Sequence, residues 1–369
     1  MVVSIAADLA VDQEEQGLFK EVAGDIAFGL YNIDLDEERK QSEEALRESE
    51  AMFKGIFSQA PIGIELYDSK GNLISVNQEC LNIFGVRNIE EIRGFKLFED
   101  PNVSEEAKTQ LRNGELVDYE SEFDFEIVKK SKLYKTTRSG KCFLHVQITP
   151  YKISDRGNNG FVVHVQDITE RKQTEEKLKK TMDAILDTIS KIIEAKDPYT
   201  AGHEHRVSQL ATAIAKELNL SQDKIEGIRI ASLIHDIGKI GVPSEILSKP
   251  TKLTDVEHSL IRSHSQIGYN ILETIDFSYP IARIVLQHHE RLNGSGYPNN
   301  LKGDEILLEA KIICVADVVE AMSSHRPYRP SLGIDAALEE ISKNKSILYD
   351  SGTVDICIRV IREKGFKFK

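Results

Sequence analysis

The 369-residue sequence lacks any apolar run that approaches the ~20 residues of a membrane-spanning helix. It also lacks a recognisable signal peptide, because the opening MVVSIAADLAV is short, has no basic segment and leads into acidic residues. Both absences predict a cytoplasmic protein that has no membrane partner. The four cysteines are scattered without a CxxC pair, which argues against a disulfide framework and against a zinc–cysteine site.

Basic residues are also fewer than acidic ones. The chain has 47 Lys and Arg residues against 60 Asp and Glu residues, for a net charge of −13. This balance argues against non-specific binding to nucleic acid polymers or to anionic membranes. A small anionic ligand is not excluded, because a metal ion or a few basic residues can reverse the local potential. The length favours two or three domains over one.

Residues 12–57 are predicted to form a helix, since apolar residues recur at threes and fours as far as Ile33. The charged stretch DEERKQSEEALRESE follows, so we expect a connecting helix that pairs with a copy of itself. The segment EVAGDIAFGLYNIDLDEERKQSEEAL resembles the last helix of a GAF sensor domain and the linker after it. Residues 1–45 are therefore expected to be a linker that is the remnant of such a domain.

Residues 58–168 have a different sequence pattern, which predicts β-strands. IGIELYDSKGNLISVN predicts strand, turn and strand, and KCFLHVQIT and GFVVHVQD alternate with period two. The opening SQAPIGIELYDSKGNLISVNQECLNIFG and the closing DITERK resemble a PAS sensor domain, over residues 46–172. The resemblance implies a small α/β domain that senses a ligand or mediates dimerisation; the ligand stays unknown. We interpret His145 and His164 as ordinary half-buried polar residues of the sheet.

Residues 173–196 are predicted to form a signalling helix. Its apolar residues are spaced 4, 3, 4 and 3, which indicates a coiled-coil seam made of Leu178, Met182, Ile185, Ile189 and Ile192. Leu186 and Ile193 add a second stripe. The pattern predicts a parallel homodimer through the 178–193 helix. The start of the helix would pair with its copy, and its later part would pack on its own domain. The alternative is one amphipathic helix packed on its own domain.

Residues 197–369 have the periodicity of many helices, so the fold class is a PAS-like α/β domain followed by an all-α bundle. Eight of the ten histidines lie between residues 203 and 325. In HDIGK, His235 and Asp236 are adjacent near the end of the apolar helix GIRIASLI. A neutral imidazole beside a carboxylate suits Fe, Mn or Zn, and the carboxylate has two oxygens with which to bridge two ions.

HDIGK together with HHERLNGSGYP resembles the HD-GYP family, a branch of the HD superfamily of metal-dependent phosphohydrolases. Supporting segments occur in the same order: DPYTAGHEHRV, GVPSEILSKPTKLTDVE, HSQIG and VADVVEAMSSHRPYRP. The resemblance spans about residues 185–365. It implies hydrolysis of cyclic di-GMP at a site with two or three metal ions, commonly iron or manganese.

The resemblance also implies a role for each matching position. The metal ligands would be His203, His235, Asp236, His264, His288, His289 and Asp317. Asp236 would be the bridging carboxylate and, with Lys239, a catalytic residue. Three basic residues would hold phosphate oxygens, namely Lys239, Arg326 and Arg329. Tyr297 of the GYP motif would lie in a loop beside the substrate.

Departures from the family pattern refine this expectation. Tyr199 stands where three-metal members carry a glutamate, and a phenol with a pKa near ~10 is a poor ligand at neutral pH. We therefore predict two divalent ions, iron first and manganese second. Asn293 replaces a common aspartate and is expected to keep the turn. The sequence leaves undecided whether three acidic residues support the metal site or have no role in it: Asp197, Glu204 and Glu290. Three histidines are interpreted as solvated, namely His205, His258 and His325.

The predicted function is hydrolysis of cyclic di-GMP to linear pGpG, and onward to GMP, under regulation by the PAS domain. Two alternatives stay open. One is a cyclic di-GMP receptor of low activity, and the other is hydrolysis of a different cyclic dinucleotide or nucleotide. The GYP loop favours cyclic dinucleotides, though not guanine over adenine.

Overall fold

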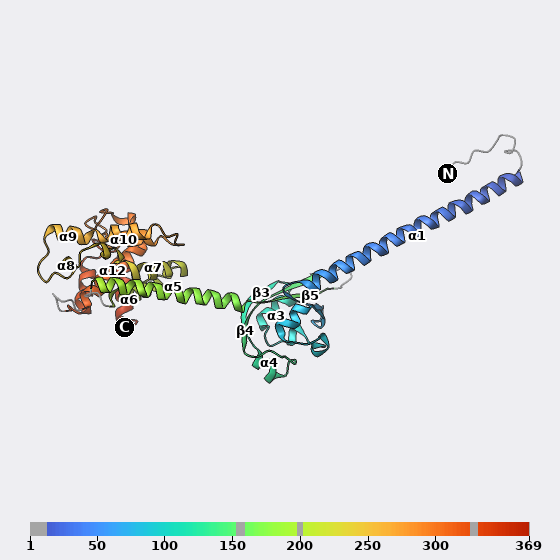
Figure 1. Cartoon of the computed structure of the whole chain (residues 1–369), viewed down its shortest axis with the longest axis horizontal. Helices are drawn as coiled ribbons and strands as arrows, with labels where there is room; N and C mark the ends of the chain where they lie inside the picture. The colour runs from blue at the N-terminus through green and yellow to red at the C-terminus, as the bar shows by residue number, and fades with distance from the viewer. Residues whose placement is uncertain (1–12, 153–158, 198–201, 325–330, 369) are drawn as a thin grey trace. The chain divides into compact units, whose positions relative to one another are not determined.

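The computed structural model describes residues 13–152, 159–197, 202–324 and 331–368 (Figure 1). The chain divides into two compact units, Met1–Glu175 and Glu176–Lys369. Within the described ranges, no helix has the length and apolar character that crossing a bilayer would require.

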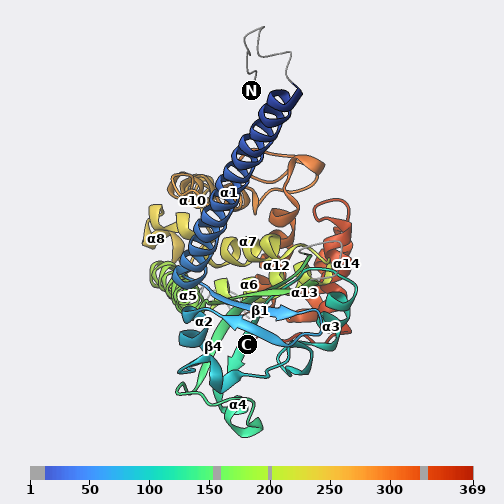
Figure 2. The ribbon, with the colours of Figure 1, turned by 90° about the vertical axis from the view of Figure 1, so that its right-hand side faces the viewer.

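The first unit begins with α1 (Gln13–Gln59), a single continuous helix (Figure 2). This confirms the helix predicted over residues 12–57. Many of its large apolar side chains are exposed, among them Leu18, Phe28, Ile33, Leu46, Met52 and Ile56. The pairing of this helix with a second copy stays a prediction.

The PAS region is built on one antiparallel sheet with the strand order β2-β1-β5-β4-β3. The strands are β1 (Gly63–Asp68), β2 (Leu73–Val76), β3 (Val117–Asp124), β4 (Lys141–Lys152) and β5 (Asn159–Asp167). The turn between β1 and β2 forms because Asp68 Oδ1 accepts hydrogen bonds from the Lys70 and Asn72 amides while Gly71 adopts a φ of +81°. The predicted strand–turn–strand is confirmed.

Short helices lie on one face of this sheet. They are α2 (Gln78–Phe84), η2 (Ile89–Ile92), η3 (Leu97–Glu99), α3 (Glu105–Arg112) and α4 (Phe125–Ser131). The strand residues that alternate toward them are buried, such as Leu144, Val146 and Ile148 of β4. His145 and His164 lie on the other face and are half-buried, and His145 Nε2 is 2.8 Å from Asp118 Oδ1. Their interpretation as ordinary sheet residues is confirmed.

Helix α5 (Thr169–Lys196) carries the two apolar stripes seen in the sequence. Leu186 and Ile193 are both 3% exposed, and Leu186 belongs to the core of the second unit. In contrast, the seam residues Leu178 and Ile192 are 70% and 52% exposed. The inward packing of the second stripe is thus confirmed, whereas the dimer through the first stripe stays a prediction.

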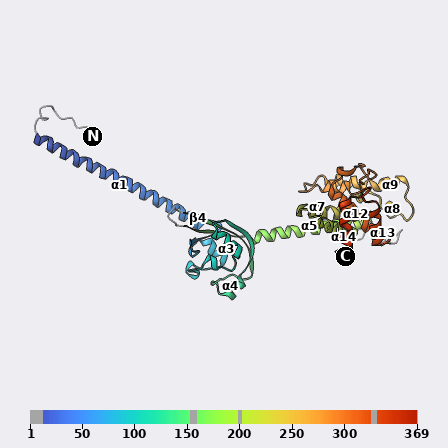
Figure 3. The ribbon, with the colours of Figure 1, turned by 180° about the vertical axis from the view of Figure 1, so that it is seen from behind.

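Every regular element among the described residues of the second unit is a helix, as the periodicity predicts (Figure 3). They are α6 (His203–Glu217), α7 (Gln222–Ile234), η5 (Ile237–Gly241), α8 (Ser244–Leu247), α9 (Asp255–Arg262), α10 (His264–Leu272), α11 (Ile281–Gln287), η6 (Gly303–Glu305), α12 (Leu308–Ser323), α13 (Ile334–Lys343) and α14 (Ser351–Arg362). The central helix is α12, which contacts α6, α7, α11, α13 and α14. Because it is surrounded, α12 is apolar on nearly every side, with Ile312, Val315 and Val319 fully buried.

Candidate metal centre

Four of the predicted ligands lie at the ends of helices. His203 and His264 are the first residues of α6 and α10, whereas His235 and His288 directly follow α7 and α11. A helix end lets a side chain turn away from the regular helical direction, so imidazoles from four helices can meet in one place. Asp317 comes from the middle of α12.

The structure brings all seven predicted ligands into one cluster. Two sets have donor atoms within 4.8 Å of one another: Asp236, His264, His288 and His289, and then His203, His235 and Asp236. Asp236 belongs to both sets. Its Oδ1 lies 3.4 Å from His264 Nε2, and its Oδ2 lies 3.6 Å from His235 Nε2. Asp317 Oδ1 lies 3.3 Å from His203 Nε2.

The backbone orients three of the imidazoles. Each Nδ1 lies within hydrogen-bond distance of the carbonyl oxygen three residues earlier: 2.8 Å for His235 to Ser232, 2.7 Å for His264 to Ile261, and 2.5 Å for His288 to Val285. A proton on Nδ1 leaves the lone pair on Nε2, the nitrogen that faces the cluster. This arrangement is what metal ligation requires, and it was not predictable from the motifs.

A carboxylate that sequence reasoning missed orients the fourth imidazole. Glu320 Oε2 accepts a hydrogen bond from His203 Nδ1, and Glu320 Oε1 accepts one from Arg206 Nε at 2.6 Å. Glu320 is 1% exposed. The signal was present in VADVVEAM, because Glu320 follows Asp317 by three residues and so shares its helix face.

Burial keeps several of these imidazoles neutral. It lowers the pKa of His288 to about 3, and it lowers the pKa values of His264 and His289 as well. Neutral imidazoles retain the lone pair that binds a metal ion. These three residues are therefore ready to act as ligands near neutral pH.

The carboxylates of the cluster are ionised. Although burial opposes the charge, Lys239 and His235 hold the pKa of Asp236 well below its usual value. Asp317 also has a low pKa, because its hydrogen bond with His203 outweighs burial. His203 is the exception among the imidazoles: despite burial, Asp317 and Glu320 raise its pKa to about 10. These acidic groups attract positive charge to this position, which a divalent ion would supply in place of the proton.

Glu204 provides an independent test of whether a cation fits. The residue is fully buried, and within the described part of the chain neither of its carboxylate oxygens has a hydrogen-bond partner. Burial raises its pKa to about 7, while the neighbouring charge of His203 acts in the opposite direction. A buried carboxylate without a partner is costly unless a cation lies nearby. Together with the imidazole and carboxylate donors, this orphaned group fits a divalent metal centre.

Lys239 lies inside the cluster. Its Nζ is 2.7 Å from Asp236 Oδ2 and 3.0 Å from Asp197 Oδ2, and its side chain is 11% exposed. Although burial opposes the charge, the two carboxylates raise the pKa of Lys239 above its ordinary value. The structure thereby gives Asp197 a role, which is to hold the lysine.

Tyr297 lies over the cluster. Its ring centroid is 4.7 Å from that of His289. The exposed Arg262, the last residue of α9, places its Cζ 5.4 Å from the Tyr297 ring centroid. Glu290 accepts hydrogen bonds from the backbone amides of Asn299 and Leu301 at 2.7 and 3.0 Å. Glu290 therefore anchors the loop after the GYP motif and does not orient an imidazole.

Tight backbone contacts fix the loop and the HDIGK segment. Asn293 Oδ1 accepts a hydrogen bond from the Ser295 amide at 3.0 Å, which confirms its turn-forming role. A Cβ at Gly296 would lie 2.4 Å from the Arg291 nitrogen, and one at Gly238 would lie 1.8 Å from the His264 carbonyl oxygen. Only glycine allows these close approaches.

The remaining sequence assignments divide into two groups. His258 is exposed, and His205 is 43% exposed in its side chain, with its Nε2 3.1 Å from Asp187 Oδ1, so both lie outside the cluster as expected. Four residues lie outside the described part of the chain: Tyr199, His325, Arg326 and Arg329.

Comparison with known families identifies both regions. Residues 61–170 match the model of the PAS domain, and residues 187–352 match the model of the HD domain.

Named relatives match the second region. A 3′3′-cGAMP-specific phosphodiesterase of Vibrio cholerae is 41% identical over 163 residues, which are 44% of this chain and 35% of that protein. The cyclic di-GMP phosphodiesterase response regulator RpfG of Xanthomonas campestris is 40% identical over 47% of each chain. A cyclic di-GMP phosphodiesterase of Thermotoga maritima is 38% identical over 48% of this chain and 49% of that protein.

The chain spans about half the length, or less, of the curated relatives that it matches. The matches, the order of the motifs and the histidine–aspartate cluster agree with one another. The chain therefore contains a PAS domain followed by an HD domain, in agreement with its resemblance to the HD-GYP family.

Proposed function

We propose that the HD domain hydrolyses a cyclic dinucleotide and that cyclic di-GMP is its substrate. The observation that carries this proposal is the convergence of six imidazole and carboxylate donors in two sets that share Asp236, with Asp317 beside His203 as a seventh. Two of the relatives named above are cyclic di-GMP phosphodiesterases, which supports guanine as the base. The PAS domain would regulate this activity.

The reaction adds one water molecule to one phosphodiester. The water oxygen forms a bond to phosphorus, the bond from phosphorus to the ribose 3′ oxygen breaks, and that oxygen takes up a proton. The product is linear pGpG with a terminal 5′ phosphate, and a second hydrolysis would give GMP. Two divalent ions, iron or else manganese, would lower the pKa of the attacking water and neutralise charge on the phosphate.

The protein's own residues would place the phosphate. The Lys239 ammonium lies beside Asp236 and would donate to a phosphate oxygen that comes to the same position. Arg262 extends beside Tyr297 at the exposed side of the cluster and would contact a second phosphate oxygen or a base. Tyr297 itself covers His289 and offers an aromatic face to the substrate. Arg326 and Arg329 stay predicted phosphate ligands.

A second candidate substrate is 3′3′-cGAMP, because a relative that is 41% identical is named for it. Both substrates carry the same phosphodiester, so the metal cluster does not distinguish them. The test is a comparison of cleavage rates for cyclic di-GMP, 3′3′-cGAMP and cyclic di-AMP. Protein purified without exposure to air would be assayed and its metal content measured on the same sample.

The Asp236→Asn variant should lose both bound metal and turnover, because Asp236 belongs to both donor sets. Asp304→Asn is the matched control, since this aspartate is fully exposed and its Oδ1 lies 3.9 Å from Lys311 Nζ. Turnover that survives in metal-stripped Asp236→Asn protein would contradict the proposal. Tight binding of cyclic di-GMP without cleavage by the metal-loaded protein would instead indicate a receptor.

A further inference from the structure

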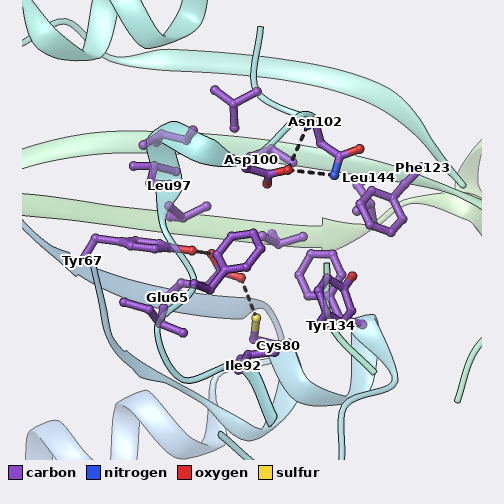
Figure 4. Close-up of a pocket in the computed structure, with 18 of the residues that line it drawn as sticks. Glu65, Tyr67, Cys80, Ile92, Leu97, Asp100, Asn102, Phe123, Tyr134 and Leu144 are labelled. Carbon is purple, nitrogen blue, oxygen red and sulfur yellow. Dashed lines mark hydrogen bonds between the residues drawn. The ribbon is translucent and has the colours of Figure 1, made fainter. Parts of the chain in front are cut away.

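The PAS domain encloses a cavity of about 70 Å³ between the sheet and its short helices (Figure 4). Most of its walls are apolar, with Phe84, Phe95 and Phe123 among the aromatic residues and Leu144 and Val163 among the aliphatic ones. The volume is roughly half that of an engineered cavity of ~150 Å³ that binds benzene. A ligand for this cavity is therefore a molecule of only a few non-hydrogen atoms.

Two carboxylates line this cavity. Glu65 projects from β1 on the same face as Tyr67, and Asp100 directly follows η3. In Figure 4 both carboxylates lie toward the interior of the pocket. Glu65 accepts hydrogen bonds from the Tyr67 hydroxyl at 2.7 Å and from the Cys80 thiol at 3.1 Å. These donors are neutral, so the negative charge of Glu65 is not compensated.

Asp100 also accepts hydrogen bonds from neutral donors. Its Oδ1 accepts hydrogen bonds from the backbone and side-chain nitrogens of Asn102, both at 2.9 Å. Because Asn102 is exposed and also lines the cavity, this side of the cavity reaches the surface. A small ligand can thus approach Asp100 from solvent.

No basic side chain lines the cavity among the residues that the structure describes. The Tyr134 hydroxyl, which also lines it, is buried and has no hydrogen-bond partner within the same described set. Burial raises the pKa values of Glu65 and Asp100, and it raises that of Tyr119 to about 12. Every acidic group here is held in an environment that disfavours negative charge, which a cation would relieve.

We propose that this cavity is a binding site for a small alkylammonium ion. The ammonium group would contact Glu65 and Asp100 and would donate to the Tyr134 oxygen. The carbon atoms would lie against the aromatic faces of Phe84, Phe95 and Phe123, where a cation is also attracted. An alkylamine is protonated at neutral pH, as lysine is with a pKa near ~10.4. Anionic ligands are disfavoured because nothing in the described lining would neutralise them.

Titration of the full-length chain tests this proposal by calorimetry, at constant ionic strength. The probes are methylammonium, ethylammonium and dimethylammonium chloride, with ethanol as the neutral analogue and acetate as the anionic one. We expect saturable binding of the ammonium ions on the order of millimolar, as suits ligands of so few atoms. Ethanol and acetate should not bind. Binding of either as tight as that of ethylammonium, or no binding of any ammonium ion, overturns the proposal.

Substitutions locate the site. Glu65→Gln and Asp100→Asn should each weaken ethylammonium binding at least about tenfold, because each removes a charge from an enclosed pair. Tyr134→Phe should weaken it by a few-fold through the loss of one acceptor. Glu115→Gln is the control, since Glu115 is exposed on the same domain and does not line the cavity. Far-UV circular dichroism of each variant establishes that it is folded.

Asp100→Asn keeps an oxygen that can accept from Asn102, so it leaves the turn intact if Glu65→Gln fails to fold. Equal affinity in folded Asp100→Asn and in Glu115→Gln would show that the ammonium ions bind elsewhere, and it would overturn the assignment to this cavity. The measurement is independent of phosphodiesterase activity, and therefore of the function proposed for the HD domain.

Discussion

The two domains enclose carboxylates in opposite ways. In the HD domain, Asp236 lies 2.7 Å from the Lys239 ammonium and is surrounded by imidazoles. In the PAS domain, a phenol and a thiol are the hydrogen-bond partners of Glu65 among the described residues. The pKa of Asp236 is held low although burial opposes the charge, whereas burial raises the pKa of Glu65.

The difference concerns the kind of cation that each group of side chains fits. The HD cluster has ionised carboxylates and oriented imidazole lone pairs, which together match a divalent metal ion. The PAS cavity offers oxygen atoms and aromatic faces but no imidazole in its described lining, which matches an organic cation. The kind of neighbour, more than the number of carboxylates, determines the ligand class.

The largest effect that separates the two regions is expected from neutralising one carboxylate in each. In protein without metal, Asp236→Asn leaves Lys239 buried with Asp197 as its only described carboxylate partner, which should lower the free energy of unfolding by about 3–5 kcal/mol. Glu65→Gln removes a charge that has no cationic partner, so it should not lower this free energy by more than about 1 kcal/mol. Denaturant unfolding in the presence of a chelator measures both.

Equal destabilisation by the two substitutions would contradict the comparison, because it would mean that Glu65 is as well compensated as Asp236. Asp304→Asn controls for the loss of an exposed aspartate. Its effect should lie within ~0.5 kcal/mol.

The HD cluster was predictable from sequence because its residues lie in short motifs of fixed order. HDIGK and HHERLNGSGYP contain four of the predicted ligands, and the order of the segments around them indicates the other three, His203, His264 and Asp317. The orientation of the rings was not predictable. It depends on carbonyls left unpaired at helix ends and on the packing of α12 against α6, which sets Glu320 beside His203.

The PAS cavity was less predictable. The alternation in IGIELYD places Glu65 and Tyr67 on one face of β1, but the sequence does not say which face is buried. Asp100 lies in a loop whose path depends on the packing of Leu97 and Val103, both almost fully buried. A charged residue on the core-facing side of a strand was the signal that could have indicated a binding site.

The next effect concerns Glu320, which orients the predicted metal ligand His203. Glu320→Gln should weaken metal affinity about 10- to 100-fold, because His203 loses the carboxylate that orients its ring. Metal titration of the chelator-stripped protein measures this. Glu309→Gln is the matched control: it lies buried on the same helix α12, accepts from the Tyr279 hydroxyl at 2.6 Å and is not in the cluster. Metal affinity that falls equally in both variants would argue against a specific role of Glu320.

A smaller effect concerns the pH dependence of the PAS domain. Burial raises the pKa of Glu65 above its ordinary value of 4.5, so the native state holds the proton more tightly than the unfolded state. The contribution of this group to stability is therefore fully present below about pH 4.5 and is lost as the pH rises through the raised pKa, at about 1.4 kcal/mol per pH unit.

Glu65→Gln does not titrate, so its stability relative to the wild type should increase across that window. Urea unfolding of both proteins at intervals between about pH 4 and about pH 8 measures the difference. Parallel curves would show that Glu65 ionises at its ordinary pKa and has a partner that compensates its charge. A millimolar alkylammonium ion should reduce the difference, because it binds only the wild type tightly.

The smallest effect distinguishes two tyrosines of the same cavity. The Tyr67 hydroxyl donates to Glu65, whereas the Tyr134 hydroxyl has no partner in the described part of the chain. Tyr134→Phe should therefore change the free energy of unfolding by less than ~0.5 kcal/mol or increase it slightly, since it removes a buried polar group that makes no bond. Tyr67→Phe should cost about 1–3 kcal/mol, because it takes a donor from a half-buried carboxylate. Thermal or urea unfolding decides between them. A clear loss of stability in Tyr134→Phe would mean that its hydroxyl is already bonded in the native protein, so that it could not be kept for a ligand.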